Sequence, residues 1–232
     1  MSVTGTVAVA VTGPTLPTTV ATTPFSNVSA TGSGQRLISQ ASGQTLIGAA
    51  AGGDLLFGGA DTRITAFGNG NTIAALPGNH TIAMGASNNI VTASDGNNTI
   101  SGTGTGDTVT AGNGNNKITL GGANDVVLCG NGANTVTATG AGASITTGSG
   151  NDSIAATAGT ATIRAGLGLN TILFAGAGNS IVNQGGTDTL TDKGTNNTLV
   201  MPIAGHGLDT ITGPVLTNGD VFDLRTAMAA TS

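Results

Sequence analysis

The chain contains no tryptophan, no tyrosine and no glutamate among its 232 residues, and only five phenylalanines. Aromatic side chains supply much of the volume of an ordinary protein core, so their scarcity excludes a core of the usual thickness. The composition is not that of a disordered chain either, because hydrophobic residues reach 38% and the net charge is only −5. These absences predict a thin aliphatic core between closely spaced layers.

Charged residues are also scarce, at 7% of the chain, and the six basic residues are scattered. Without a basic patch or aromatic stacking platform, nucleic-acid binding is not expected. No apolar run approaches the roughly 20 residues of a membrane helix, so membrane insertion is not expected. The only cysteine, Cys129, excludes an internal disulfide and is interpreted as a small side chain at a turn edge. The first residues lack the basic and apolar regions of a cleaved signal peptide, so any export is expected to use another route.

What the sequence does contain is a nine-residue repeat between residues 28 and 199. Every ninth residue is Val, Ile or Leu, with no predicted break in register: Val28, Leu37, Leu46, Leu55, Ile64, Ile73, Ile82, Val91, Ile100, Val109, Ile118, Val127, Val136, Ile145, Ile154, Ile163, Ile172, Ile181, Leu190 and Leu199. This period matches neither an α-helix nor a long alternating strand. It predicts a strand of about three residues followed by a turn of about six.

Each repeat is expected to place its aliphatic residue inward and its neighbours outward, as at Val109 between Thr108 and Thr110. Two repeats would form a coil of about 18 residues with one strand in each of two parallel sheets. The predicted fold is therefore all-β, a parallel β-roll or β-solenoid. The turns contain glycines at which we expect positive φ: Gly112, Gly114, Gly130 and Gly132.

Three segments are predicted along the chain. Residues 1–27 combine a strand-like alternation with a Pro/Thr-rich stretch, and could be a cap, a tail or a strand donated to another subunit. Residues 28–205 form the solenoid. Residues 206–232 are interpreted as a C-terminal cap that also resembles a secretion signal.

Several repeats fit the pattern G-x-G-N-D-x-I, with the best match at residues 148–154 and others at 121–127 and 104–109. This pattern resembles the RTX, or haemolysin-type calcium-binding, repeat. The phrases DTI at 209–211 and GDVFDLR at 219–225 resemble the ends of proteins exported by type I secretion. The resemblance covers about residues 50–232. It implies a calcium-linked β-roll at the cell surface or outside the cell, exported by a type I apparatus without a cleaved N-terminal signal.

The resemblance also identifies the position two residues before each inward aliphatic as the calcium-binding aspartate of the family. Here this position is mostly Asn, and Asp occurs in the nine-residue register from residue 71 onward at Asp107, Asp125, Asp152 and Asp188. Residues 18 apart should stack on one edge, so Asp107 and Asp125 would form the one family-like Ca²⁺ site. Asp152 and Asp188 are two coils apart, separated by Asn170, and are weaker candidates.

Asparagine supplies only one neutral oxygen, so each Asn should weaken calcium binding. Stacked Asn amides could instead hydrogen-bond from coil to coil as a purely structural ladder. His80 occupies the same position and is interpreted as a replaced ladder residue rather than a metal ligand.

An enzyme is not expected, because the basic residues of the repeat region are dispersed and no catalytic constellation is apparent: Arg63, Lys117, Arg164 and Lys193. The favoured function is a secreted structural protein that associates head to tail through the solenoid ends into a filament, surface layer or biofilm matrix. The alternative is a calcium-responsive binding or adhesin module, including ice or polysaccharide binding by threonine arrays. Lys117 and Leu173 interrupt the relevant face.

Overall fold

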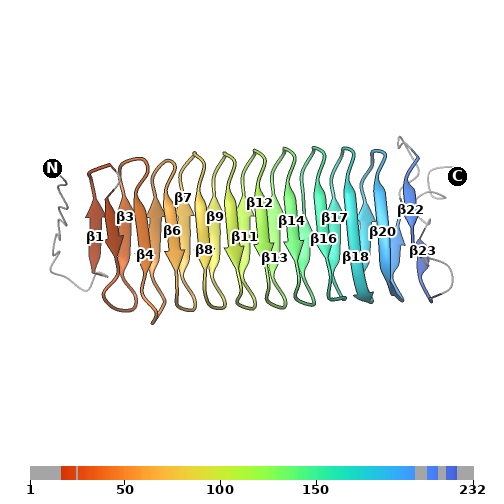
Figure 1. The fold of residues 1–232 in the computed structure, drawn as a ribbon, viewed down its shortest axis with the longest axis horizontal. Helices are drawn as coiled ribbons and strands as arrows, with labels where there is room; N and C mark the ends of the chain where they lie inside the picture. Colours follow the sequence, from red (N-terminus) through yellow and green to blue (C-terminus); the bar gives the residue numbers. More distant parts are fainter. Residues whose placement is uncertain (1–16, 25, 202–207, 214–217, 224–232) are drawn as a thin grey trace, which may run out of the picture.

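The computed structural model describes residues 17–24, 26–201, 208–213 and 218–223. All regular structure in these ranges is β-strand, wound into an elongated coil with β1 and β23 at opposite ends of the rod (Figure 1). Successive strands alternate between a 12-stranded sheet, called sheet A, and an 11-stranded sheet, called sheet B. Both sheets are entirely parallel, which confirms the predicted β-solenoid.

The odd-numbered strands form sheet A in chain order: β1 (Thr18–Ala21), β3 (Arg36–Ser39), β5 (Leu55–Gly58), β7 (Thr72–Ala75), β9 (Ile90–Ala93), β11 (Thr108–Ala111), β13 (Val126–Cys129), β15 (Ser144–Thr146), β17 (Thr162–Ala165), β19 (Ser180–Asn183), β21 (Thr198–Val200) and β23 (Val221–Asp223). The even-numbered strands form sheet B: β2 (Asn27–Ser29), β4 (Thr45–Gly48), β6 (Arg63–Ala66), β8 (Thr81–Met84), β10 (Thr99–Gly102), β12 (Lys117–Leu120), β14 (Thr135–Ala138), β16 (Ser153–Ala156), β18 (Thr171–Ala177), β20 (Thr189–Thr195) and β22 (Thr210–Thr212).

Neighbouring strands in a sheet are related by one coil of the chain. Val109 in β11 pairs with Val127 in β13, and Ile100 in β10 pairs with Ile118 in β12, so equivalent residues are 18 apart. Most strands contain four residues rather than the predicted three. The reason is that the second residue after each aliphatic also points inward, as the buried Ala111 and Leu120 show.

The core is a thin double layer between the two sheets. Its first column consists of the repeated aliphatic residues, and all but one of those predicted are buried. Its second column is made mainly of small residues, with Leu120 and Phe174 among the few large ones. Cys129 belongs to this second column rather than to a turn edge, and burial raises the pKa of its thiol to about 12, with the charge of Asp152 adding to the effect.

The exception is Leu55, which the nine-residue register placed inward. The structure buries Leu56 completely and leaves Leu55 half-buried, so that prediction was wrong. Arg36 pairs with Leu55 across 19 residues, and Leu55 pairs with Thr72 across 17. The turn before β5 is one residue longer and the turn after it one residue shorter than usual, so the register recovers within one coil.

The glycines were only partly predicted. Gly114 and Gly132 have positive φ, at 126° and 125°. Gly112 and Gly130 do not, and are required for close packing between coils instead. A Cβ on Gly112 would lie 2.7 Å from Asp95 N, and one on Gly130 would lie 2.8 Å from Gly112 C.

The stacked strands extend beyond residues 28–205. β1 pairs with β3 at one end, while β22 and β23 extend both sheets at the other. Within the predicted terminal segments, residues 1–16, 25, 206–207, 214–217 and 224–232 lie outside the described residues. Across the ranges that the structure describes, no helix has the length and apolarity needed to cross a membrane.

Candidate functional site: two buried polar ladders

The position two residues before each inward aliphatic closes the turn that leads into the next strand. Its residues stack in two columns, one at the start of the sheet A strands and one at the start of the sheet B strands. Ladder A consists of Asp54, Asn71, Asn89, Asp107, Asp125, Ala143, Ala161, Asn179, Asn197 and Asp220. Ladder B consists of Thr62, His80, Asn98, Asn116, Asn134, Asp152, Asn170, Asp188 and Asp209. All are buried except Asp209 and Asp220, which are partly buried.

Within each ladder, the Asp, Asn and His side chains accept the backbone N–H of the residue one coil earlier. Asn89 N donates to Asp107 Oδ1 at 2.8 Å, and Asp107 N donates to Asp125 Oδ1 at 2.9 Å. In ladder B, Asn116 N donates to Asn134 Oδ1 at 3.2 Å. The side chains therefore satisfy buried backbone donors at the point where each turn enters a strand.

An asparagine makes a second set of bonds through its amide nitrogen. Asn116 Nδ2 donates to Gly112 O at 3.0 Å and Gly114 O at 3.1 Å in its own turn, and also lies 3.0 Å from Asn134 Oδ1. Asn98 and Asn134 repeat this arrangement. The asparagine ladder expected from the sequence is therefore present, and each Asn satisfies both of its polar atoms within the chain.

An aspartate cannot make the second set of bonds, because Oδ2 is an acceptor where Asn has a donor. Oδ2 is buried and has no hydrogen-bond partner in each predicted metal ligand: Asp107, Asp125, Asp152 and Asp188. A buried acceptor without a partner costs about 1–3 kcal/mol. Either a proton on Oδ2 or a bound cation would remove this cost, so these residues fit a Ca²⁺ ion in a way that the Asn residues do not.

The electrostatics point in the same direction. Burial raises the pKa of Asp107, Asp125 and Asp188, and the backbone N–H groups that donate to them only partly oppose this. The charge of Asp107 adds to the effect of burial on the pKa of Asp125. The negative charge on these groups is therefore poorly compensated, which favours uptake of a proton or cation.

The four predicted aspartates lie at the ladder positions that the 18-residue coil predicted. Asp107 and Asp125 are adjacent in ladder A, as predicted. Asp152 and Asp188 remain two coils apart, because Asp152 N donates to Asn170 Oδ1 and Asn170 N donates to Asp188 Oδ1. The carboxylate next to Asp188 is Asp209, whose Oδ1 accepts Asp188 N at 2.9 Å.

Three aspartates at ladder positions, and a fourth outside the ladders, were missed from the sequence. Asp54 was hidden by the local register shift, and both of its oxygens have donors, Gln35 N and Ala49 N. Asp209 and Asp220 precede Ile211 and Phe222 with the same spacing as the other ladder residues, which was a usable signal. Asp192 lies in the core column rather than in a ladder, and the repeat pattern gave no sign of a charged residue there.

Only a small number of carboxylates is available at each position. No group of three or more His, Cys, Asp or Glu side chains within the described ranges is arranged to hold a metal ion. A cation beside Asp107 and Asp125 would therefore need carbonyl oxygens and water as its remaining ligands. His80 is not available as a ligand, because Nδ1 accepts Thr62 N at 3.1 Å and Nε2 is bonded to Leu76 O, so it replaces a ladder residue.

A second set of polar side chains, exposed in the turns, forms hydrogen bonds in the opposite direction along the rod. Asn97 N donates to Asn79 Oδ1, and Asn115 N donates to Asn97 Oδ1, both at 2.8 Å. Here the side chain accepts from the following coil, whereas a ladder residue accepts from the preceding coil. Each of these turns is therefore tied to both of its neighbours, which favours a straight and regular stack.

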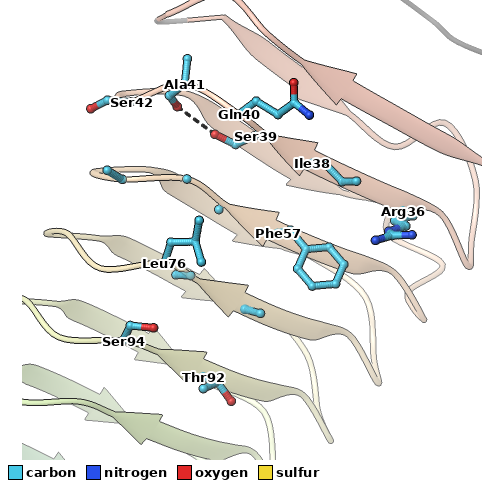
Figure 2. Close-up of a pocket in the computed structure, with 15 residues that line it drawn as sticks. Arg36, Ile38, Ser39, Gln40, Ala41, Ser42, Phe57, Leu76, Thr92 and Ser94 are labelled. Carbon is cyan, nitrogen blue, oxygen red and sulfur yellow. Dashed lines mark hydrogen bonds between the residues drawn. The ribbon is translucent and has the colours of Figure 1, made fainter.

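A separate open groove lies on the outer face of sheet A near the N-terminal end. It has a volume of about 670 Å³, and Figure 2 shows Ile38, Phe57 and Leu76 among its lining side chains. Arg36 lies over the Phe57 ring, with its guanidinium carbon 5.1 Å from the ring centroid. Arg36 is the only ionisable side chain among the described residues that line this groove. The groove therefore offers a mainly apolar surface with one cation, and not an acid–base pair.

Comparison of the chain with family models, with characterised proteins and with solved structures finds no match in any of the three. The fold is compatible with an RTX-like β-roll.

Proposed function

We propose that this chain is a non-enzymatic structural rod that assembles head to tail through its two ends. The observation that carries this proposal is the arrangement of the end strands. Within the described residues, β1 and β23 are the first and last strands of sheet A, and β2 and β22 are the first and last strands of sheet B. A second copy could add its β1 to β23 and its β2 to β22, which would continue both sheets without a change in strand direction.

Such a contact would join different surfaces of the two copies, so it would not close into a dimer. Repetition of a heterologous contact of this kind produces a filament. Edge strands are ready templates for pairing, and the low charge of the chain gives little repulsion between copies. Exposed apolar residues at the C-terminal end, Leu208 and Val221, favour the same contact.

The setting we propose for the rod is extracellular, in a surface layer, filament or biofilm matrix. The resemblance of the repeats and of residues 209–225 to RTX proteins supports export by a type I apparatus. It also supports Ca²⁺ binding at Asp107 and Asp125, with weaker candidates at Asp152 and Asp188. The chain would cross its exporter unfolded and fold outside, where calcium is at about 1 mM. Because the polar atoms of the Asn side chains find hydrogen-bond partners within the chain, we expect most coils to fold without metal.

A second candidate function is binding of a repetitive surface such as ice or a polysaccharide. It is favoured by one outward column of sheet B, in which exposed hydroxyl residues recur at equivalent positions of successive strands: Thr81, Thr99, Thr135, Ser153, Thr171 and Thr189. Strand spacing in a sheet is about 4.8 Å, so the hydroxyl groups form a regular row. Lys117 interrupts the row between Thr99 and Thr135.

Electron microscopy of the purified chain over a range of concentration and calcium tests the assembly. Pro17 O accepts Arg36 N and Ala21 O accepts Gln40 N, so by strand alternation Val20 directs its N–H to the opposite, outer edge. Val20→Pro should therefore shorten or abolish filaments while the rod still folds, and Val20→Thr, which keeps the N–H, should not. Monomeric wild-type rods under every condition would refute the assembly and give priority to ice and polysaccharide binding assays.

A further inference from the structure

A second pair of carboxylates, unrelated to the repeated aspartate position, lies at the C-terminal end of the rod. Asp192 is in the middle of β20 and points into the core, in the column that Phe174 occupies one coil earlier. Its side chain is only 1% exposed. Oδ1 accepts Gly194 N at 2.7 Å and Asn197 Nδ2 at 3.0 Å, whereas the buried Oδ2 has no hydrogen-bond partner.

The other member of the pair is Asp220, at the end of ladder A. Its Oδ1 accepts Asn197 N at 2.7 Å, and its Oδ2 is also buried without a hydrogen-bond partner. The two carboxyl groups are neighbours because both accept hydrogen bonds from Asn197. Asn197 therefore holds both groups, one through its backbone and one through its side chain, with an unsatisfied oxygen remaining on each.

Two carboxylates this close cannot both be ionised without a compensating positive charge. Burial raises the pKa of Asp192, and the charge of Asp220 raises it further. A shared proton would leave one negative charge in the core, whereas one divalent cation would neutralise both groups. Asp220 as a residue is only partly buried, although its Oδ2 is enclosed, so water entering from this end of the rod could complete the ligand set that a hard cation requires.

We propose that Asp192 and Asp220 bind one divalent cation of the calcium type through their Oδ2 atoms. The cation joins β20 of sheet B to the residue immediately before β23 of sheet A, and so fastens the last described coil to the rod. It differs from the turn positions because one ligand comes from the interior of a strand. It does not depend on the assembly proposed above.

Calorimetric titration of the full-length, EDTA-treated and dialysed protein with CaCl₂ tests the site. The wild type should bind one more ion per chain than Asp192→Asn or Asp220→Asn. Calcium should also slow amide hydrogen exchange at Val221 and Phe222 in the wild type and in the control variant Asp125→Asn, which removes a turn carboxylate. Neither Asp192→Asn nor Asp220→Asn should show this slowing.

In EDTA, Asp192→Asn should unfold at a denaturant concentration at least as high as the wild type, because an amide can donate to Asp220. This control separates loss of the ion from loss of the fold. Equal ion stoichiometry and equal calcium-dependent protection in wild type and both variants would overturn the proposal. A wild type that loses stability as the pH rises and is not restored by calcium would also overturn it, in favour of a shared proton. These readouts use the unassembled chain, so a failed filament assay leaves them unaffected.

Discussion

Replacement of Asp152 by asparagine should stabilise the calcium-free protein. Asp152 lies between Asn134 and Asn170 in ladder B, and its Oδ2 is buried without a hydrogen-bond partner. In the preceding coil, Asn134 Nδ2 donates to Gly130 O at 3.1 Å and Gly132 O at 3.0 Å. An amide at residue 152 would meet the equivalent carbonyl groups of its own turn.

The substitution preserves size and keeps the Oδ1 atom that accepts Asn134 N. It removes an unsatisfied buried acceptor, which costs about 1–3 kcal/mol, and adds hydrogen bonds worth about 0.5–1.5 kcal/mol each. Loss of the stronger bond that a charged Oδ1 accepts offsets part of this gain. We therefore expect the free energy of unfolding to rise by about 1–3 kcal/mol, which for a chain of this size corresponds to several degrees in Tm.

Urea denaturation followed by circular dichroism, in EDTA at neutral pH, measures this change. The reciprocal variant Asn134→Asp is the matched control, since it introduces a second unsatisfied oxygen and should destabilise by a similar amount. If Asp152 binds calcium, then ~1 mM calcium should stabilise the wild type more than it stabilises Asp152→Asn. A calcium-free Asp152→Asn that is less stable than the wild type would refute the account of why Asn and Asp differ here.

Three further predictions test the ladder charge, the spacing between coils and the core register. Burial raises the folded-state pKa of Asp125 above 3.8, so the folded protein binds that proton more tightly than the unfolded chain. Calcium-free stability should therefore be greatest below about pH 4 and fall as pH rises through the folded pKa, less steeply in Asp125→Asn, as urea midpoints at several pH values would show. Gly122→Ala should cost about 1–3 kcal/mol because its Cβ would overlap Gly104 O, whereas Gly121→Ala, with no atom closer than 3.7 Å, should be nearly neutral in thermal melts. Leu56→Ala should cost about 2–5 kcal/mol and Leu55→Ala much less, and equal losses in urea denaturation would contradict the register shift.

The nine-residue spacing was sufficient to predict the fold because each coil repeats the same physical requirement. An inward aliphatic must recur at one position and a turn must fit between strands, so the strands, the two sheets and the ladders all follow from one period. Pairing of Asp107 with Asp125 followed as well, because it depends only on the 18-residue coil.

The sequence was misleading where the coil length changes. Leu55 and Leu56 are both aliphatic, so composition could not decide which faces inward, and the turn lengths on either side decided it. At the C-terminal end, Asp188 is followed in its ladder by Asp209 after 21 residues, and Asn197 by Asp220 after 23. These longer coils place carboxylates together that a fixed 18-residue spacing does not relate.

The distribution of Asn and Asp along the ladders therefore divides the rod into regions with different requirements. Coils closed by Asn satisfy their polar atoms internally, whereas carboxylates with an unsatisfied oxygen are concentrated in the middle and at the C-terminal end. In a solenoid each coil contacts mainly its neighbours. An unsatisfied carboxylate therefore destabilises the coils beside it before it destabilises the whole rod. A cation or proton would consequently control how firmly the C-terminal coils are held, and through them the surface to which a second copy would pair in the assembly we propose. The Asn coils would preserve the rest of the rod in either state.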